Sequence, residues 1–252
     1  MTWDNSAITI ATLLPLAGAL VITLVPRENE VAIRALGIVF TGAALVVAIA
    51  ILVGFDYGGG SALQFELDTA WIPAISARFH VGIDGISLPL YVLTFAISFL
   101  CAVYTWRFVP SPGRAKAFLA LMLVLETGMA GTFIAFDLIL FFVFWELVLV
   151  PMYFLIGIWG SANREYAAIK FFLYTLFGSV FMLLGFLALY FTGPADRTFD
   201  LVKLTEFGAS GGYSHGFQLI VFGAVALGFA IKVPWRMRPA CSSWSPPAQG
   251  RR

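Results

Sequence analysis

Long apolar stretches separated by short polar segments run through the first 234 residues of the chain. An apolar stretch of about 20 residues forms a helix long enough to cross the hydrocarbon core of a bilayer. The pattern therefore predicts an all-α polytopic membrane protein. We expect seven membrane-spanning helices, near residues 8–25, 31–55, 86–106, 115–136, 138–160, 167–191 and 217–234.

Two of the segments between these helices are long. Residues 56–85 contain two runs, 63–68 and 79–84, in which apolar and polar side chains alternate on either side of Pro73. Alternation with a period of two indicates strands, so we expect a short β-hairpin on the outer surface. Residues 193–216 are polar and rich in glycine, which predicts a loop.

Two histidines and one aspartate in these long segments lead to specific expectations. His80 and His215 both fall in them, and we expect both imidazoles to be solvated. Asp84 directly precedes the third apolar stretch. A carboxylate is stabilising near the N-terminus of a helix, so we expect Asp84 to mark the start of that helix.

The basic residues near the helix ends are distributed unequally between the two sides of the membrane. The side with more Lys and Arg is cytoplasmic by the positive-inside rule. This places the N-terminus outside and the C-terminus inside. The cytoplasmic set is Arg27, Arg34, Arg107, Arg114, Lys116, Arg164 and Lys170, and the outer set is Arg78, Arg197 and Lys203.

Composition excludes several classes of function. Apolar residues make up 60% of the chain and charged residues 12%, against about 25% charged in a soluble domain. The net charge of +1 gives no indication of a basic face that would bind nucleic acid. We expect the lipid bilayer to surround the chain. Cys101 and Cys241 form neither a disulfide framework nor a metal-binding spacing. The spans contain no His for haem and the chain has no nucleotide-binding glycine motif, so we expect no cofactor and no metal.

Glu146, Glu126 and Lys232 are the candidate functional residues, because each lies inside a predicted span with apolar neighbours. A charge at the bilayer centre costs roughly 2.5–3.5 kcal/mol, and such residues often carry ions or protons. At about 1.5 Å per residue, they lie about 12, 15 and 22 Å below the outer surface, respectively. Helix tilt, the length of the Lys side chain or a helix break at Pro234 would bring Lys232 closer to the carboxylates.

Less specific interpretations of these three residues stay open. Either glutamate can be a single polar contact between two helices. Lys232 can extend its ammonium to the cytoplasmic interface.

Four runs of sequence resemble a known family. They are FDLILFFVFWELVLVPMYFLIGIWG at 136–160, REYAAIKFFLYTLFGS at 164–179, HVGIDGISLP at 80–89 and GFAIKVP at 228–234. They resemble subunit M (chain 4) of respiratory complex I, the NADH–quinone oxidoreductase, which belongs to the antiporter-like membrane subunits.

The resemblance implies a role in proton translocation, without a redox centre in this chain. It implies that Glu146 and Lys232 form a charge pair, and that Glu126 matches a third glutamate of the family. It further implies assembly with other membrane-arm subunits of complex I in the inner membrane of a bacterial cell.

The sequence departs from the resemblance after Pro234. Residues 235–252 have no apolar period and contain three prolines and four arginines. We expect this polar tail to be disordered, and we expect the chain to be a truncated or frameshifted form of the antiporter-like fold.

Two other functions stay open. One is a subunit of a multi-subunit cation/proton antiporter or of a membrane-bound hydrogenase, because these share the glutamate and the lysine. The other is a non-functional truncated fragment, which the tail favours.

Overall fold

The seven expected spans are present in the computed structural model, which describes residues 3–58, 63–109 and 112–232. All are long and apolar enough to cross a membrane, so the predicted fold class is confirmed. The chain is a multi-pass membrane protein. Its long helices are α1 (Trp3–Leu24), α2 (Glu30–Gly54), α3 (Ser87–Thr105), α4 (Ala115–Ile134), α5 (Leu138–Leu147) with α6 (Leu149–Trp159), α7 (Arg164–Thr192) and α9 (His215–Lys232).

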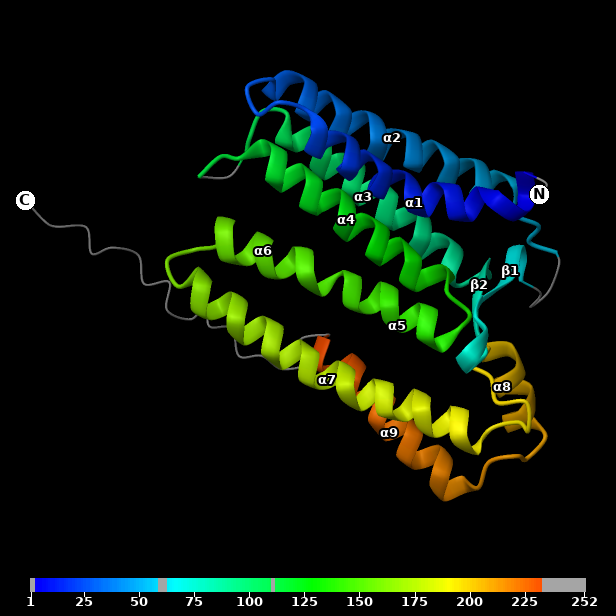
Figure 1. Ribbon diagram of the computed structural model, residues 1–252. Coiled ribbons are helices and arrows are strands. Elements are labelled where there is room, and N and C mark those ends of the chain that lie inside the picture. Colours follow the sequence, from blue (N-terminus) through cyan, green and yellow to red (C-terminus); the bar gives the residue numbers. More distant parts are fainter. Residues whose placement is uncertain (1–2, 59–62, 110–111, 233–252) are drawn as a thin grey trace, which may run out of the picture.

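The helices form two groups that lie side by side (Figure 1). The first four pack into one bundle, in which α4 contacts α1, α2 and α3. α5 and α6 lie against α4, and α7 and α9 lie beyond them. Apolar side chains fill the centre of the first group, including the fully buried Tyr91 and Phe95. The N-terminus, the hairpin and the short helix α8 lie at the same end of the molecule (Figure 1).

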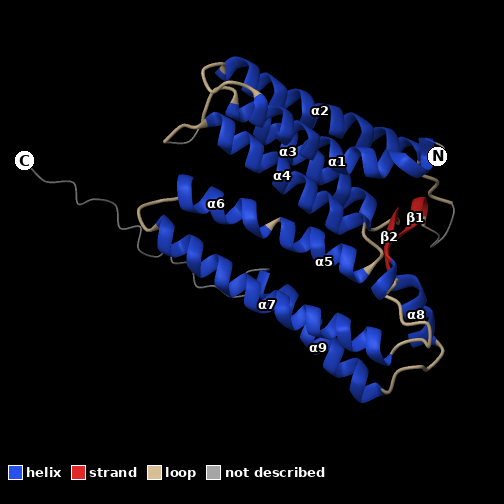
Figure 2. Ribbon diagram, viewed as in Figure 1, coloured by secondary structure: helices blue, strands red, loops and turns tan. Residues whose placement is uncertain are grey.

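The fifth span is divided at Val148, between α5 and α6, and the interruption is visible in Figure 2. Pro151 lacks an N–H to donate to the carbonyl of Leu147, and its ring crowds that carbonyl, which breaks a helix. Gly128 of α4 lies against the break, because a Cβ there would lie 3.1 Å from the backbone nitrogen of Val148. Glu146 is therefore in the last turn of α5. The apolar run over residues 138–160 had predicted one continuous helix here.

The expected hairpin is present. β1 (Gln64–Ile72) pairs antiparallel with β2 (Ala77–Ile83), and a 3-10 turn at Pro73–Ile75 joins them. Asp84 also acts as expected. Its carboxylate oxygen Oδ1 accepts hydrogen bonds from the backbone nitrogens of Ile86 at 3.0 Å and Ser87 at 2.6 Å, where α3 begins.

The expectation of a loop over residues 193–216 is wrong for its central part. This segment contains the helix α8 (Leu201–Ala209). Asp200 initiates α8, because its carboxylate accepts from the backbone nitrogens of Val202 and Lys203. Leu204 buries its side chain in the apolar cluster that also holds Phe199. A capping Asp followed by apolar residues favours a helix, and here it outweighed the neighbouring glycines.

Two glycines allow α9 to pack closely on α7. A Cβ on Gly228 would lie 2.9 Å from the Cβ of Met182 and 3.1 Å from the carbonyl oxygen of Gly178. A Cβ on Gly178 would in turn meet Ile231 at 2.8 Å. Small residues allow close backbone approach between helices in membranes. This contact fixes the position of α9, which carries Lys232 near its end.

Residues 233–252 lie outside the part of the chain that the structure describes. A helix break at Pro234 and the disorder of residues 235–252 therefore stay predictions.

Gly228→Ala should destabilise the protein, because the new methyl group meets the backbone of α7. We expect a loss of about 1–3 kcal/mol, typical of overpacking. Gly223→Ala on the same helix is the matched control, since nothing lies within 4 Å of a Cβ there. It should be neutral or stabilising by up to about 1 kcal/mol. Thermal unfolding of both variants in detergent measures the difference, and equal melting temperatures would refute the close packing.

Candidate functional site

Lys232 and Glu146 form an ion pair between α9 and α5. The ammonium nitrogen Nζ of Lys232 lies 3.6 Å from Oε1 of Glu146, and the side chains are 15% and 22% exposed. The sequence placed Lys232 deeper than Glu146, but the structure brings the two charged ends together. Helix α9 approaches α5 through Phe229, whose ring lies 4.9 Å from that of Trp145. The contact occurs at the helix break, in the last turn of α5.

Trp145 also contacts the ammonium group of Lys232. Nζ donates a hydrogen bond of 2.7 Å to the carbonyl oxygen of Trp145. It also lies 4.1 Å from the centroid of the Trp145 ring. The ammonium therefore has three electron-rich neighbours, of which only the Glu146 carboxylate was expected from the sequence.

Within the described residues, no hydrogen bond or ion pair joins Glu126 to Glu146 or Lys232. The side chain of Glu126 is fully buried, and neither carboxylate oxygen has a hydrogen-bond partner there. Residues four apart share a helix face, so Glu126 faces the same way as Met122 and Ala130, which belong to the apolar clusters of the first bundle. A buried carboxyl group without a partner is costly, which is why such groups are often functional.

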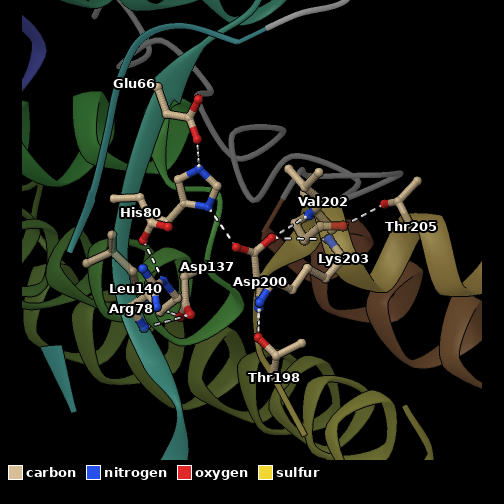
Figure 3. Close-up of polar contacts among 12 residues, drawn as sticks. Glu66, Arg78, His80, Asp137, Leu140, Thr198, Asp200, Val202, Lys203 and Thr205 are labelled. Atoms are coloured by element: carbon tan, nitrogen blue, oxygen red, sulfur yellow. Dashed lines mark hydrogen bonds and ion pairs between the residues drawn. The ribbon is translucent and has the colours of Figure 1, made fainter. Parts of the chain in front are cut away.

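A second polar cluster lies at the end of the molecule that holds the hairpin and centres on His80 (Figure 3). Its Nδ1 is 3.0 Å from a carboxylate oxygen of Asp200, and its Nε2 is 2.9 Å from one of Glu66. His80 is only 3% exposed, so the expectation of a solvated imidazole is wrong. His215 is exposed, as expected. Strand β2 is covered on both faces, so alternation alone does not give the burial of His80.

The His80 cluster is joined by hydrogen bonds to the beginning of α5. The backbone nitrogen of Phe136 donates to the carbonyl of His80, and that of Leu201 donates to the carbonyl of Phe136. Asp137 starts α5 by accepting from the nitrogens of its first turn, and it also accepts from the nitrogen of Arg78. The hairpin, α5 and α8 are thus joined directly (Figure 3).

Asp68, His80 and Asp200 have ligand atoms within 4.8 Å of one another, a grouping that a metal ion can occupy. Other contacts account for these groups without an ion. Asp68 forms an ion pair with Arg78 at 2.6 Å, and both ring nitrogens of His80 face carboxylates. We interpret the cluster as a network of ion pairs.

The charges in this network support one another. The hydrogen bond to Asp200 raises the pKa of His80 above its ordinary value, although burial opposes this. Burial alone would raise the pKa of Asp200, but hydrogen bonds from His80 and from backbone nitrogens lower it below its ordinary value. The raised pKa favours the imidazolium form of His80 between the two carboxylates.

Comparison with known proteins relates the chain to one family. Residues 135–249 match the family described as "NADH:quinone oxidoreductase/Mrp antiporter, TM". The match contains Glu146 and Lys232, begins after Glu126, and includes most of the 235–252 segment that we expected to depart from the family.

Individual relatives are similar over nearly all of this chain. "NAD(P)H-quinone oxidoreductase chain 4 1" of Picosynechococcus sp. is 40% identical over 229 residues, which are 90% of this chain and 41% of the relative. "NADH-quinone oxidoreductase subunit M" of Rickettsia felis is 36% identical over 90% of this chain and 45% of its own length. The chain therefore spans less than half the length of these curated relatives.

A solved structure shares the fold. A chain of respiratory complex I from Thermus thermophilus with bound NADH superposes with a TM-score of 0.75 and 27% identity. The superposition covers 90% of this chain and 44% of that one.

His80→Gln should destabilise the protein at mildly acidic to neutral pH, because it removes the charge that faces Asp200 and Glu66. We expect a loss of about 2 kcal/mol for this hydrogen-bonded charge. The folded-state pKa of His80 is above 6.5, so its contribution is full below 6.5 and is lost as pH rises through the folded value. The folded-state pKa of Asp200 is below 3.8, so its contribution is lost as pH falls through that lower value.

The melting temperature of purified protein as a function of pH measures this effect. The wild type and His80→Gln should differ most below the raised pKa of His80 and converge above it. His215→Gln is the matched control, because that imidazole is exposed. A difference that does not change with pH would mean that His80 is neutral in the folded protein.

Proposed function

We propose that this chain, which belongs to the NADH:quinone oxidoreductase/Mrp antiporter family of membrane proteins, takes part in proton translocation by an NADH:quinone oxidoreductase. The observation that carries the proposal is the ion pair between Lys232 and Glu146 at the break between α5 and α6. The named relatives are quinone oxidoreductase subunits, and this supports the choice of complex.

The proposed mechanism is electrostatic. An opposite charge nearby favours the charged form of both Lys232 and Glu146. A movement that separates them removes this support, so Lys232 then releases its proton and Glu146 takes one up. Broken helices in membrane proteins are tolerated where they are buried or line a cavity, and they commonly form ion sites. Electron transfer belongs to other subunits in this proposal.

Glu126 is proposed as a further proton-binding group in the same chain. Support comes from its complete burial and from its two carboxylate oxygens, which lack partners among the described residues. Internal water is the proposed carrier of protons between Glu126 and the ion pair, since ionisable residues within membrane helices mark such pathways.

The proposal includes a location and partners. The chain spans the inner membrane of a bacterial cell, with its N-terminus outside and its C-terminus in the cytoplasm. The unequal distribution of Lys and Arg supports this orientation. Other membrane-arm subunits of the complex are its protein partners, and lipid covers the remaining apolar helix faces.

A subunit of a cation/proton antiporter is the rival function, because the matched family includes Mrp antiporters. The names of the relatives that are 36–40% identical favour the quinone oxidoreductase.

Glu146→Gln should reduce proton pumping driven by NADH at least severalfold, because it removes the charge that holds the Lys232 proton. NADH-driven acidification of inverted membrane vesicles, made from cells that express the variant, measures this effect. Glu146→Asp should be milder, since the charge stays but is one methylene shorter.

Glu165→Gln is the matched control, because Glu165 is exposed at the start of α7. The amount of assembled complex should be equal in all samples. Normal pumping by the Gln variant would exclude Glu146 from the pathway.

A further inference from the structure

The ammonium group of Lys232 is held more closely by Trp145 than by Glu146. Its hydrogen bond to the Trp145 carbonyl is 2.7 Å long, whereas the nearest Glu146 oxygen lies at 3.6 Å. The indole ring lies beneath the same nitrogen, at 4.1 Å from its centroid. One residue thus supplies two contacts that do not depend on the glutamate.

The position of Trp145 in α5 makes its carbonyl a favourable acceptor. The last four carbonyls of a helix lack partners further along that helix, and Trp145 lies in the last turn of α5. The C-terminal end of a helix also carries partial negative charge, which attracts cations. The break at Val148 therefore exposes an acceptor for Lys232 in the interior of the protein.

The indole ring adds a second attraction. A cation over the face of Trp is attracted by the ring, more strongly when water is excluded. Phe141 stacks on the Trp145 ring and Phe229 meets it edge-on, which fixes its orientation. The indole nitrogen has no hydrogen-bond partner among the described residues. The ring is thus placed by packing and by the ammonium group.

We infer that Trp145 is a positioning residue that holds the protonated amine of Lys232 beside Glu146 and keeps a place for it when Glu146 withdraws. The inference rests on the proposed function. In this arrangement the break after α5 provides a second binding position for the ammonium group, made of a carbonyl and an aromatic face. Loss of Glu146 then weakens the hold on the proton without abolishing it.

The protonation of Lys232 depends on the charged groups that face it. Glu146 on α5 is the charged group that faces Lys232 within the described part of the chain. Helix α7, which packs along α9, meets it through Gly178, Gly185 and apolar side chains. The pH dependence of Lys232 should therefore respond to two residues, Glu146 and Trp145.

The test measures the protonation of Lys232 directly. A small amine-reactive anhydride modifies only the neutral amine, so the pH dependence of Lys232 labelling, read by mass spectrometry, reports its protonation. Trp145→Leu should shift this labelling curve to lower pH by roughly one unit, a tenfold increase in neutral amine at a given pH. Trp145→Phe should shift it less, because a weaker aromatic face remains.

Trp159→Leu is the matched control, because it makes the same replacement in the same span, at a tryptophan that packs on Phe118 and donates to the carbonyl of Gly113. It should leave the labelling curve unchanged even if it lowers the amount of protein. Equal shifts in Trp145→Leu and Trp159→Leu would reduce Trp145 to a packing residue and overturn the inference. An unchanged curve in Trp145→Leu would overturn it as well.

Glu146→Gln separates this inference from the proposed function. If it shifts the labelling curve and lowers pumping while Trp145→Leu shifts nothing, the function stands and the inference fails. If pumping is normal in Glu146→Gln, the proposed function fails, whatever the labelling of Trp145→Leu shows.

Discussion

Burying the charges of Lys232 and Glu146 among apolar helices is costly unless each faces the other. Their contact requires α9 and the last turn of α5 to lie at fixed positions. The glycine contact between α7 and α9 fixes the position of α9, and the break at Val148 fixes where α5 ends. The ion pair is thus the result of packing on both sides, and a change in either helix alters its strength.

The His80 cluster extends this arrangement to the end of the molecule that holds the hairpin. α5 is short, and its beginning is hydrogen-bonded to the hairpin and to the segment that precedes α8. His80 adds an ion-pair network at the same place. A helix of ten residues therefore connects the end of the molecule that holds the hairpin with the residue pair in the interior. A movement at one end of α5 would therefore displace the other end.

Hydropathy was sufficient to predict the seven spans, because each helix in lipid satisfies its own backbone and its apolar length is visible in the sequence. The proposed role of Glu146 and Lys232 came from their position in apolar runs and from a family resemblance. The hairpin followed from alternation around Pro73. These features depend on local sequence.

Features that depend on distant partners were not predictable in this way. His80 meets Asp200, which is 120 positions away, whereas its place in a long segment between two spans favoured a solvated imidazole. The second contact of Lys232 is a backbone carbonyl, which no side-chain pattern reveals. We did not predict the helix α8, because the glycines of this segment favoured a loop and Asp200 was not considered as a helix cap. Pro151 does indicate a break in α5, but the apolar run concealed it.

The most direct test of the account is an exchange of the two charges. Glu146→Lys and Lys232→Glu alone each place like charges beside each other, and NADH-driven proton pumping should be lost. The double exchange restores opposite charges at the same contact, so pumping should recover above either single variant at equal levels of assembled complex. A double variant that pumps no better than the single variants would contradict the claim that this ion pair drives proton movement.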